Sequence, residues 1–269
     1  MNPHERFIHD LPRTEQLIGE ALSIDGLTAD FRIYQRLKGH RHSIDDAATS
    51  WYALQKSPRV SRALDLGSGI GSVGLAVLWG LGAEASLVCI EAQEISYKLL
   101  EANIAGNGVG DRVRAMHGDL RDVDLGEKFP LVTGSPPYFP INSGVLPPDS
   151  QKAHARFELR GDVSDYARAA IRHLEPNGWF VFCFPFQQKS RCIELVHGTG
   201  MRIVSVKDVV PHPNKPPLFS LYAARLHWDG EMEVEPPLIV STERGHYSTE
   251  MLELQRSRGF GDLGTNQLG

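Results

Sequence analysis

From residue 60 onward the sequence alternates short apolar runs, rich in β-branched residues, with longer stretches of helical periodicity. This alternation is typical of βαβ units, because two parallel strands need a crossover and a helix supplies it. Strands are predicted near 61–66, 86–91, 112–116, 129–134, 178–184, 201–209 and 218–228, and helices near 71–81, 94–106, 162–175 and 187–198. The chain is therefore expected to form a mostly parallel sheet covered by helices.

The last two predicted strands differ from the others, because only Pro211 to Pro217 separate them. That connection is too short for a crossover helix, so the two strands should pair antiparallel. The fold class predicted from the sequence is α/β: a Rossmann-like seven-stranded, mostly parallel sheet with helices on both faces and a C-terminal antiparallel hairpin.

Three regions are expected. Residues 1–59 form a helical N-terminal extension with a loop, 60–228 form the α/β domain, and 229–269 form an acidic tail that becomes Gly-rich and frays. Within the domain, residues 135–160 are rich in Pro, Gly and Ser and have no clear periodicity. Such long segments are usually functional or disordered.

Composition narrows the class of protein. With 269 residues, of which 41% are hydrophobic and 23% charged, the chain can bury a full core. A formal net charge of -5 argues against nonspecific coating of nucleic acid, although 151–228 carry more basic than acidic residues and a local basic face is possible.

The three cysteines, Cys89, Cys183 and Cys192, have no CxxC spacing, which indicates neither a disulfide framework nor a zinc site. His40-Arg41-His42, with two nearby aspartates, matches no standard metal spacing, and a solvated loop is favoured there. Neither a signal peptide nor a membrane span is evident, so a cytoplasmic location is expected.

A glycine loop follows the first strand of the domain. Gly67, Gly69 and Gly71 alternate between that strand and the next helix, so a ligand can approach the backbone at a helix N-terminus. Another register, Gly69 to Gly74, fits the GxGxxG pattern of NAD-binding proteins, and Glu91 follows at a suitable distance. The loop alone leaves both cofactors open.

Two further residues favour S-adenosylmethionine. Asp65, still on the strand, suits a ligand with a cationic amino-acid moiety and is unfavourable beside a pyrophosphate. Asp119 offers an acceptor for the adenine amino group, and Leu120 offers an apolar contact to the ring. The structural alternatives are that Glu91 and Asp119 cap the segments after them and that Asp65 accepts from turn amides.

Ser135-Pro136-Pro137-Tyr138 follows the predicted strand 129–134. Both prolines fix φ and lack N–H groups, so the turn is rigid and its carbonyls are free to accept hydrogen bonds. The C-terminal edge of an open α/β sheet is where ligands bind. The tetrapeptide therefore predicts a site that grips a planar amine, with Tyr138, and less strongly Phe139, as its aromatic wall.

The order of these motifs resembles, over roughly 60–228, the class I S-adenosylmethionine-dependent methyltransferases and, within them, the amino-methyltransferases marked by [Asn/Asp/Ser]-Pro-Pro-[Tyr/Phe/Trp]. Ile44 to Ala47, Pro236 to Val240 and Tyr247-Ser248 look more narrowly like the bacterial tRNA adenine 6-amino methyltransferases that modify a base next to the valine anticodon. Those enzymes typically carry Asn at the position of Ser135. Ser there is familiar from DNA cytosine 4-amino methyltransferases.

The resemblance implies S-adenosylmethionine as cofactor and structured RNA, with tRNA as the first choice, as partner, with the extension's loop covering the cofactor. It assigns cofactor binding to Asp65, Gly67, Gly69, Gly71, Glu91, Asp119, Leu120 and Ser135, and the catalytic site to Ser135, Pro136, Pro137 and Tyr138. The Ser135 hydroxyl and the Pro136 carbonyl would accept from the target amine, and Tyr138 would stack on the base. A DNA amine, a protein glutamine amide, an NAD-linked oxidoreductase and a silent binding module are the alternatives.

Overall fold

The computed structural model describes residues 2–141, 147–243 and 246–261. Its centre is an eight-stranded sheet in the order β10-β8-β9-β7-β6-β3-β4-β5. The strands are β3 (Arg62–Leu66), β4 (Ser86–Glu91), β5 (Val113–His117), β6 (Phe129–Gly134), β7 (Leu174–Pro185), β8 (Arg202–Val210), β9 (Phe219–Arg225) and β10 (Glu233–Ile239). All pairs are parallel except those of β9 with β7 and β8, so the mostly parallel sheet and its terminal hairpin are confirmed.

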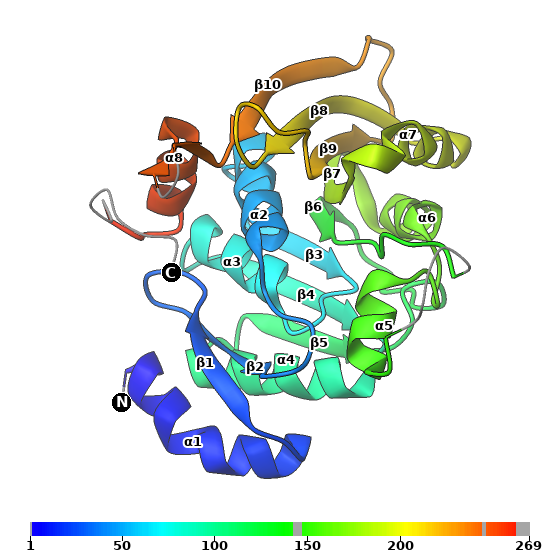
Figure 1. Ribbon diagram of the computed structural model, residues 1–269. Helices are drawn as coiled ribbons and strands as arrows, with labels where there is room; N and C mark the ends of the chain where they lie inside the picture. Colours follow the sequence, from blue (N-terminus) through cyan, green and yellow to red (C-terminus); the bar gives the residue numbers. More distant parts are fainter. Residues whose placement is uncertain (1, 142–146, 244–245, 262–269) are drawn as a thin grey trace.

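Helices cover both faces of the sheet, as predicted (Figure 1). One hydrophobic core joins the sheet to α2 (Ile44–Lys56), α3 (Ser72–Leu81) and α4 (Glu94–Asn107), and a second joins it to α6 (Val163–His173) and α7 (Lys189–Gly198). Among the described residues, no helix is both long and apolar enough to cross a bilayer.

The N-terminal extension is not purely helical. Between α1 (Pro3–Ile18) and α2 it contains a hairpin of β1 (Leu22–Gly26) and β2 (Arg32–Arg36). Two side chains of α4 hold this hairpin: Asn103 Oδ1 accepts from the Tyr34 amide at 2.7 Å, and Asn107 Oδ1 accepts from the Arg32 amide at 2.8 Å. The hairpin's position therefore depends on a helix that lies about 70 residues further along the chain.

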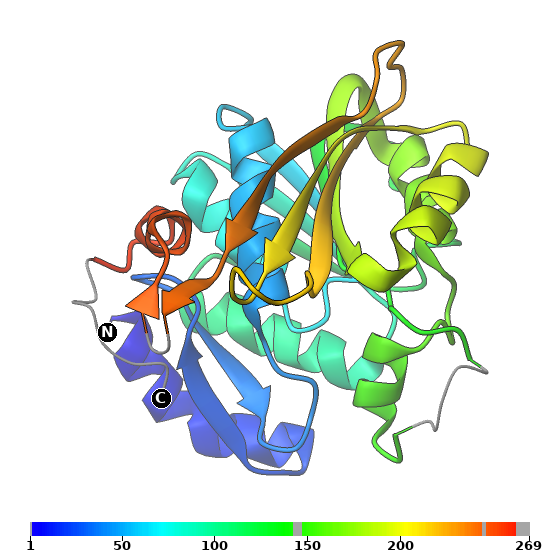
Figure 2. The ribbon, with the colours of Figure 1, turned by 45° about the horizontal axis from the view of Figure 1, so that its top comes forward.

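The C-terminal region, expected to be a tail, adds the eighth strand. β10 pairs parallel with β8 at the edge of the sheet (Figure 2), and β11 (Ser241–Glu243), β12 (His246–Tyr247) and α8 (Thr249–Ser257) follow. The negative charge of Glu235, in β10, is balanced by two lysines: its carboxylate lies 2.6 Å from Lys56 Nζ and 3.4 Å from Lys207 Nζ. Burial opposes its ionisation, yet hydrogen bonds from Lys56 and Tyr52 lower the pKa of Glu235 to about 2. The fraying predicted for the Gly-rich end concerns 262–269, outside the described residues.

Candidate functional site

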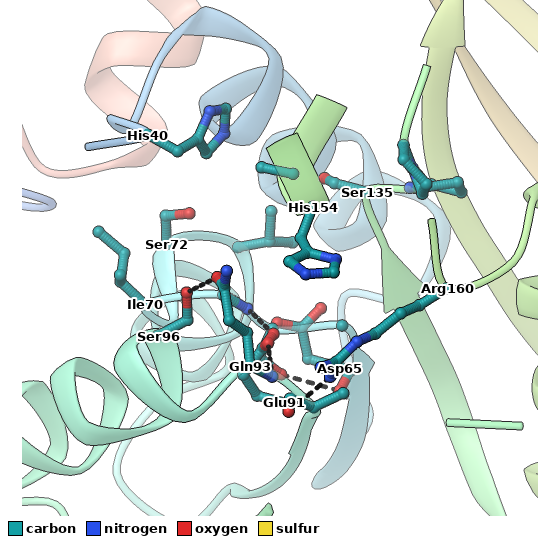
Figure 3. A pocket seen from close by; sticks show the side chains of 18 of the residues that line it. His40, Asp65, Ile70, Ser72, Glu91, Gln93, Ser96, Ser135, His154 and Arg160 are labelled. Atoms are coloured by element: carbon teal, nitrogen blue, oxygen red, sulfur yellow. Dashed lines mark hydrogen bonds between the residues drawn. The ribbon is translucent and has the colours of Figure 1, made fainter. Parts of the chain in front are cut away.

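The carboxyl ends of β3, β4, β5 and β6 open onto one cavity of about 350 Å³ (Figure 3). That volume is within the range of about 300–1,000 Å³ typical of small-molecule sites. The cavity brings together almost all the residues that the sequence nominates: Asp65, Gly67, Gly69, Glu91, Asp119, Leu120, Ser135, Pro136, Pro137 and Tyr138. Gly71 is the exception. It precedes α3 with φ +91°, and a Cβ there would meet Leu100 and Leu75, so its glycine serves packing and turn geometry.

The glycine loop is shaped by two close approaches. Gly67 has φ +61°, and a Cβ on it would lie 2.2 Å from the Tyr166 hydroxyl oxygen. Gly69 has φ +56°, yet a Cβ there would have no neighbour within 4 Å. The first glycine is therefore required by the protein's own packing, whereas the second borders unfilled space at the N-terminus of α3, where a ligand can contact the backbone.

Asp65 is almost fully buried, at 1% exposure, beneath the glycine loop. Its carboxylate accepts from Thr133 Oγ1 at 2.7 Å and from the Gly74 amide at 3.1 Å. Burial raises the pKa of Asp65 to about 6, against the opposing effect of these hydrogen bonds. The alternative that Asp65 accepts from turn amides is thus partly correct, since Asp65 accepts from an amide in the first turn of α3. Asp65 also lines the cavity.

Glu91 joins the end of β4 to the glycine loop. Oε2 accepts from the Gly69 amide at 2.8 Å and Oε1 accepts from the Gln93 amide at 2.6 Å. Burial raises its pKa. Each carboxylate oxygen has a second lone pair, so Glu91 can still accept from a ligand hydroxyl while it holds the loop.

Asp119 has a partner within its own turn. Its carboxylate accepts from the Arg121 guanidinium at 2.7 and 2.9 Å, and also from the Arg121 amide. Hydrogen bonds from Arg121 lower the pKa of Asp119. Asp119 therefore lines the cavity as a carboxylate whose negative charge is balanced by the Arg121 guanidinium. Leu120, at 6% exposure, lies beside it.

The Ser-Pro-Pro-Tyr turn lines the cavity directly after β6. Pro136 and Pro137 are buried, and the hydrogen bonds of the described residues provide no donor for the Pro136 carbonyl. The Ser135 hydroxyl lies 3.7 Å from Cys183 Sγ, a weak contact. The amides of Tyr138 and Phe139 both donate to the Arg156 carbonyl, at 3.0 and 2.9 Å, which holds the turn against the segment that follows it.

Sequence reasoning missed several residues of this site. The segment without periodicity contains α5 (Ser150–Arg156), which brings Gln151 and His154 to the cavity, and Arg160 follows it. His154 Nδ1 is buried and has no hydrogen-bond partner among the described residues, and burial with the nearby Arg160 lowers its pKa. A helix of seven residues is too short to show a period. Asp149, whose side chain caps it, is the one signal that the sequence offered.

His42, one of the histidines before α2, has a partner within the N-terminal extension. The described part of the chain contains no cluster of three or more side chains suited to a metal ion. His42 Nδ1 lies 3.2 Å from Asp46 Oδ2 instead, inside the capping box that starts α2. These residues line the cavity, so the loop borders the site.

The charge of the cavity discriminates between the two cofactors. Five carboxylates line it: Asp45, Asp46, Asp65, Glu91 and Asp119. Arg156 and Arg160 also line the cavity, and Arg121 pairs with Asp119. The remaining excess of carboxylates favours the sulfonium and ammonium groups of S-adenosylmethionine over a dinucleotide's pyrophosphate. The open space at Gly69 and two buried polar atoms of the cavity without partners among the described residues fit a polar ligand: Gln93 Nε2, a donor, and His154 Nδ1, a donor or an acceptor according to its tautomer.

Comparisons with known proteins agree with this geometry, although no protein-family model matches. A predicted O-methyltransferase from Agrobacterium tumefaciens superposes with a TM-score of 0.62 over 80% of this chain and 97% of its own, at 18% identity. A Trm5 enzyme in complex with tRNA-Leu superposes with a TM-score of 0.53 over 77% of this chain and 53% of its own, at 14% identity. Both likenesses concern the fold alone.

The curated relatives of the chain are methyltransferases, and its fold is shared by solved methyltransferases, so the chain is placed in the class of methyltransferases with a Rossmann-like sheet. Among curated relatives, the chain is 24% identical over 211 residues to the tRNA1(Val) (adenine(37)-N6)-methyltransferase of Bacteroides fragilis, which covers 77% of this chain and 85% of that relative. The protein of the same description from Parabacteroides distasonis is 27% identical over 61% of this chain and 69% of its own.

Proposed function

We propose that this chain transfers a methyl group from S-adenosylmethionine to the exocyclic amine of an adenine in tRNA. One observation carries the proposal: the Ser-Pro-Pro-Tyr turn faces the same cavity as Gly69 and Glu91. A methyl donor held by the loop and an amine held by the turn would therefore meet inside one enclosed site. Residues 60–228 would form the catalytic domain and 1–59 would border the cofactor, and the cytoplasm is the proposed site of action.

The cofactor supplies an activated methyl group, so the chain's tasks are binding, orientation and exclusion of water. An exocyclic amine is a weak nucleophile because its lone pair is conjugated with the ring. The Ser135 hydroxyl and the Pro136 carbonyl would each accept from one amine N–H, which turns the lone pair toward the methyl carbon. Orientation of this kind can contribute up to about 7–11 kcal/mol.

The aromatic wall would be Tyr138, which lines the cavity and meets Phe184 edge-on with ring centroids 6.0 Å apart. Stacking on a base contributes about 1–3 kcal/mol in proteins that bind single strands. Phe139 is 38% exposed beside it and would contact a flanking base.

A second candidate substrate is a protein glutamine amide. The release factor glutamine methyltransferase of Xylella fastidiosa is 28% identical to this chain over 170 residues, 58% of this chain and 60% of that relative. A carboxamide presents the same planar pair of N–H groups to two acceptors as an aminopurine does. A DNA amine is the third candidate, because Ser135 takes the place of Asn.

The test is to incubate the purified protein with labelled S-adenosylmethionine and separate RNA, DNA and protein fractions, then to identify the modified residue by mass spectrometry. Label in tRNA, recovered as N6-methyladenosine, is expected. Label found only in protein, as methylglutamine, or only in DNA would replace the proposal by the corresponding alternative. A Tyr138→Ala protein serves as the control for trapped cofactor.

A further inference from the structure

A chain of hydrogen bonds runs from the N-terminal hairpin to the cavity. Arg36, at the end of β2, donates from Nη1 to Gln151 Oε1 at 3.1 Å. Gln151 Nε2 donates to Ser96 Oγ at 3.2 Å, and Ser96 Oγ donates to Gln93 Oε1 at 2.8 Å. Ser96 and Gln151 are only 4% and 2% exposed, so water does not compete for these contacts. Figure 3 shows the last link, between Ser96 and Gln93, at the edge of the cavity.

The first member determines the direction of every bond. A guanidinium can only donate, so Gln151 must turn its oxygen toward Arg36 and its nitrogen toward Ser96. The His40 amide also donates to Gln151 Oε1, at 3.2 Å, which supports the same orientation. Ser96 then accepts from Gln151 and has its own proton left for Gln93. Amide orientations follow from such networks, and here the network leaves the Gln93 nitrogen as the free end.

That free end has no partner within the described residues. Gln93 Nε2 is buried and unpaired, although a buried donor without an acceptor is costly. Gln93 lines the cavity two residues after Glu91, whose carboxylate can accept from a ligand hydroxyl, and Asp119 and Leu120 line the same cavity. A fixed donor at this position selects a ligand atom that accepts.

We propose that Gln93 donates a hydrogen bond to an acceptor atom on the nucleoside half of S-adenosylmethionine, and that Arg36, Gln151 and Ser96 are positioning residues that fix its polarity. The inference rests on the cofactor assignment and not on the identity of the methylated polymer. It gives the N-terminal hairpin a role in cofactor recognition, because Arg36 acts on the cavity through Gln151.

Calorimetry with S-adenosylhomocysteine and with 5′-methylthioadenosine, which keeps the nucleoside and lacks the amino acid, tests the first part. Gln93→Leu should lower the affinity of the protein for both ligands by the same factor, about three- to ten-fold. Gln93→Glu, which replaces the donor by a carboxylate, should weaken them more. Gln16→Leu, on the exposed face of α1, is the matched control and should bind as the wild type does.

The positioning role requires a double-mutant cycle. Ser96→Ala removes one hydroxyl and frees Gln93 to rotate. It should lower the affinity for S-adenosylhomocysteine by a smaller factor than Gln93→Leu does. Added to Gln93→Leu, it should cost nothing further, because the two residues act as one unit. Additive losses would show that Ser96 has only a structural role and would overturn the positioning claim.

Two results would overturn the contact itself: unchanged affinity of Gln93→Leu for both ligands, or a loss confined to S-adenosylhomocysteine, which would place the contact on the amino-acid half. The failure of the cofactor assignment is a separate outcome. In that case the wild-type protein would bind neither ligand, and the Gln93 comparison would fall with it.

Discussion

The Tyr138 hydroxyl donates a hydrogen bond to Asp45 Oδ2 over 2.8 Å, and this contact ties the Ser-Pro-Pro-Tyr turn to the first turn of α2. The same hydroxyl lies 3.2 Å from Cys183 Sγ on β7. The ring is thus held by three elements: its own turn, the N-terminal extension and the sheet. A flat wall for a base requires this kind of restraint, because a ring that rotates freely would lose much of its stacking energy on ordering.

Replacing Tyr138 should separate stacking from tethering. Tyr138→Ala is expected to abolish methylation and to leave S-adenosylhomocysteine affinity unchanged. Tyr138→Phe keeps the ring and loses the bond to Asp45, so kcat should fall about ten-fold, in line with a hydrogen bond to a charged group. Kinetics with tRNA and calorimetry with S-adenosylhomocysteine measure the two effects, and normal turnover by the Ala variant would remove the stacking assignment.

Glu91→Ala should weaken S-adenosylhomocysteine at least about ten-fold, because it removes an acceptor and also releases the Gly69 and Gln93 amides that Glu91 holds. The matched control is Glu94→Ala, three residues along the chain, whose side chain is 70% exposed. Isothermal titration of both variants makes the comparison. If the Glu91→Ala and Glu94→Ala variants bind S-adenosylhomocysteine equally well, Glu91 only caps the segment after β4.

Asp65 should make stability depend on pH. Its pKa rises on folding from 3.8 to about 6, so the folded state holds the proton more tightly than the unfolded chain does. Stability from this group is complete below about pH 4 and is lost as the pH rises through about 6, by up to about 3 kcal/mol. Asp65→Asn can accept from the Gly74 amide with its oxygen and donate to Thr133 Oγ1 with its nitrogen, and it should lose this dependence. Urea unfolding of both proteins from pH 4 to 8 measures it, and parallel pH profiles would contradict the prediction.

The two glycines of the loop should respond differently to Ala. Gly67→Ala should destabilise strongly, because its Cβ would overlap Tyr166. Gly69→Ala meets no atom within 4 Å, so it should cost only the strain of positive φ, about 1 kcal/mol, and should impair cofactor binding more than stability. Gly126→Ala, at φ +65° with equally open space, carries a similar strain at a residue that does not line the cavity and should leave binding intact. Thermal unfolding and calorimetry separate these effects.

Much of the fold was predictable because its signals are local. The seven strands and four helices of the domain follow from periodicity, and β6 (Phe129–Gly134) was placed at its exact limits. β10 was not predicted, since its acidic sequence with Pro236-Pro237 reads as a tail. It becomes a strand only because Lys56 and Lys207 neutralise Glu235 and β8 provides an edge.

The site was predictable where a backbone requirement restricts the residue type. Gly67, Gly69, the prolines and the acidic residue at the end of β4 carry their signal in short motifs. Gln93, Gln151 and His154 carry none, because a polar side chain acquires a role only from what surrounds it.

The sequence by itself determined the alternation of the seven predicted strands and four predicted helices between residues 60 and 228, the glycine loop and the rigid Ser-Pro-Pro-Tyr turn, since periodicity, φ preferences and missing N–H groups are properties of neighbouring residues. Only the tertiary structure decided that Asp45 holds Tyr138 and that the turn after β6 shares a cavity with the glycine loop after β3. It also decided that Arg36 sets the polarity of Gln93 through Gln151. These relationships join residues far apart in the chain, and they exist because burial removes water and obliges each polar group to find its partner in the fold.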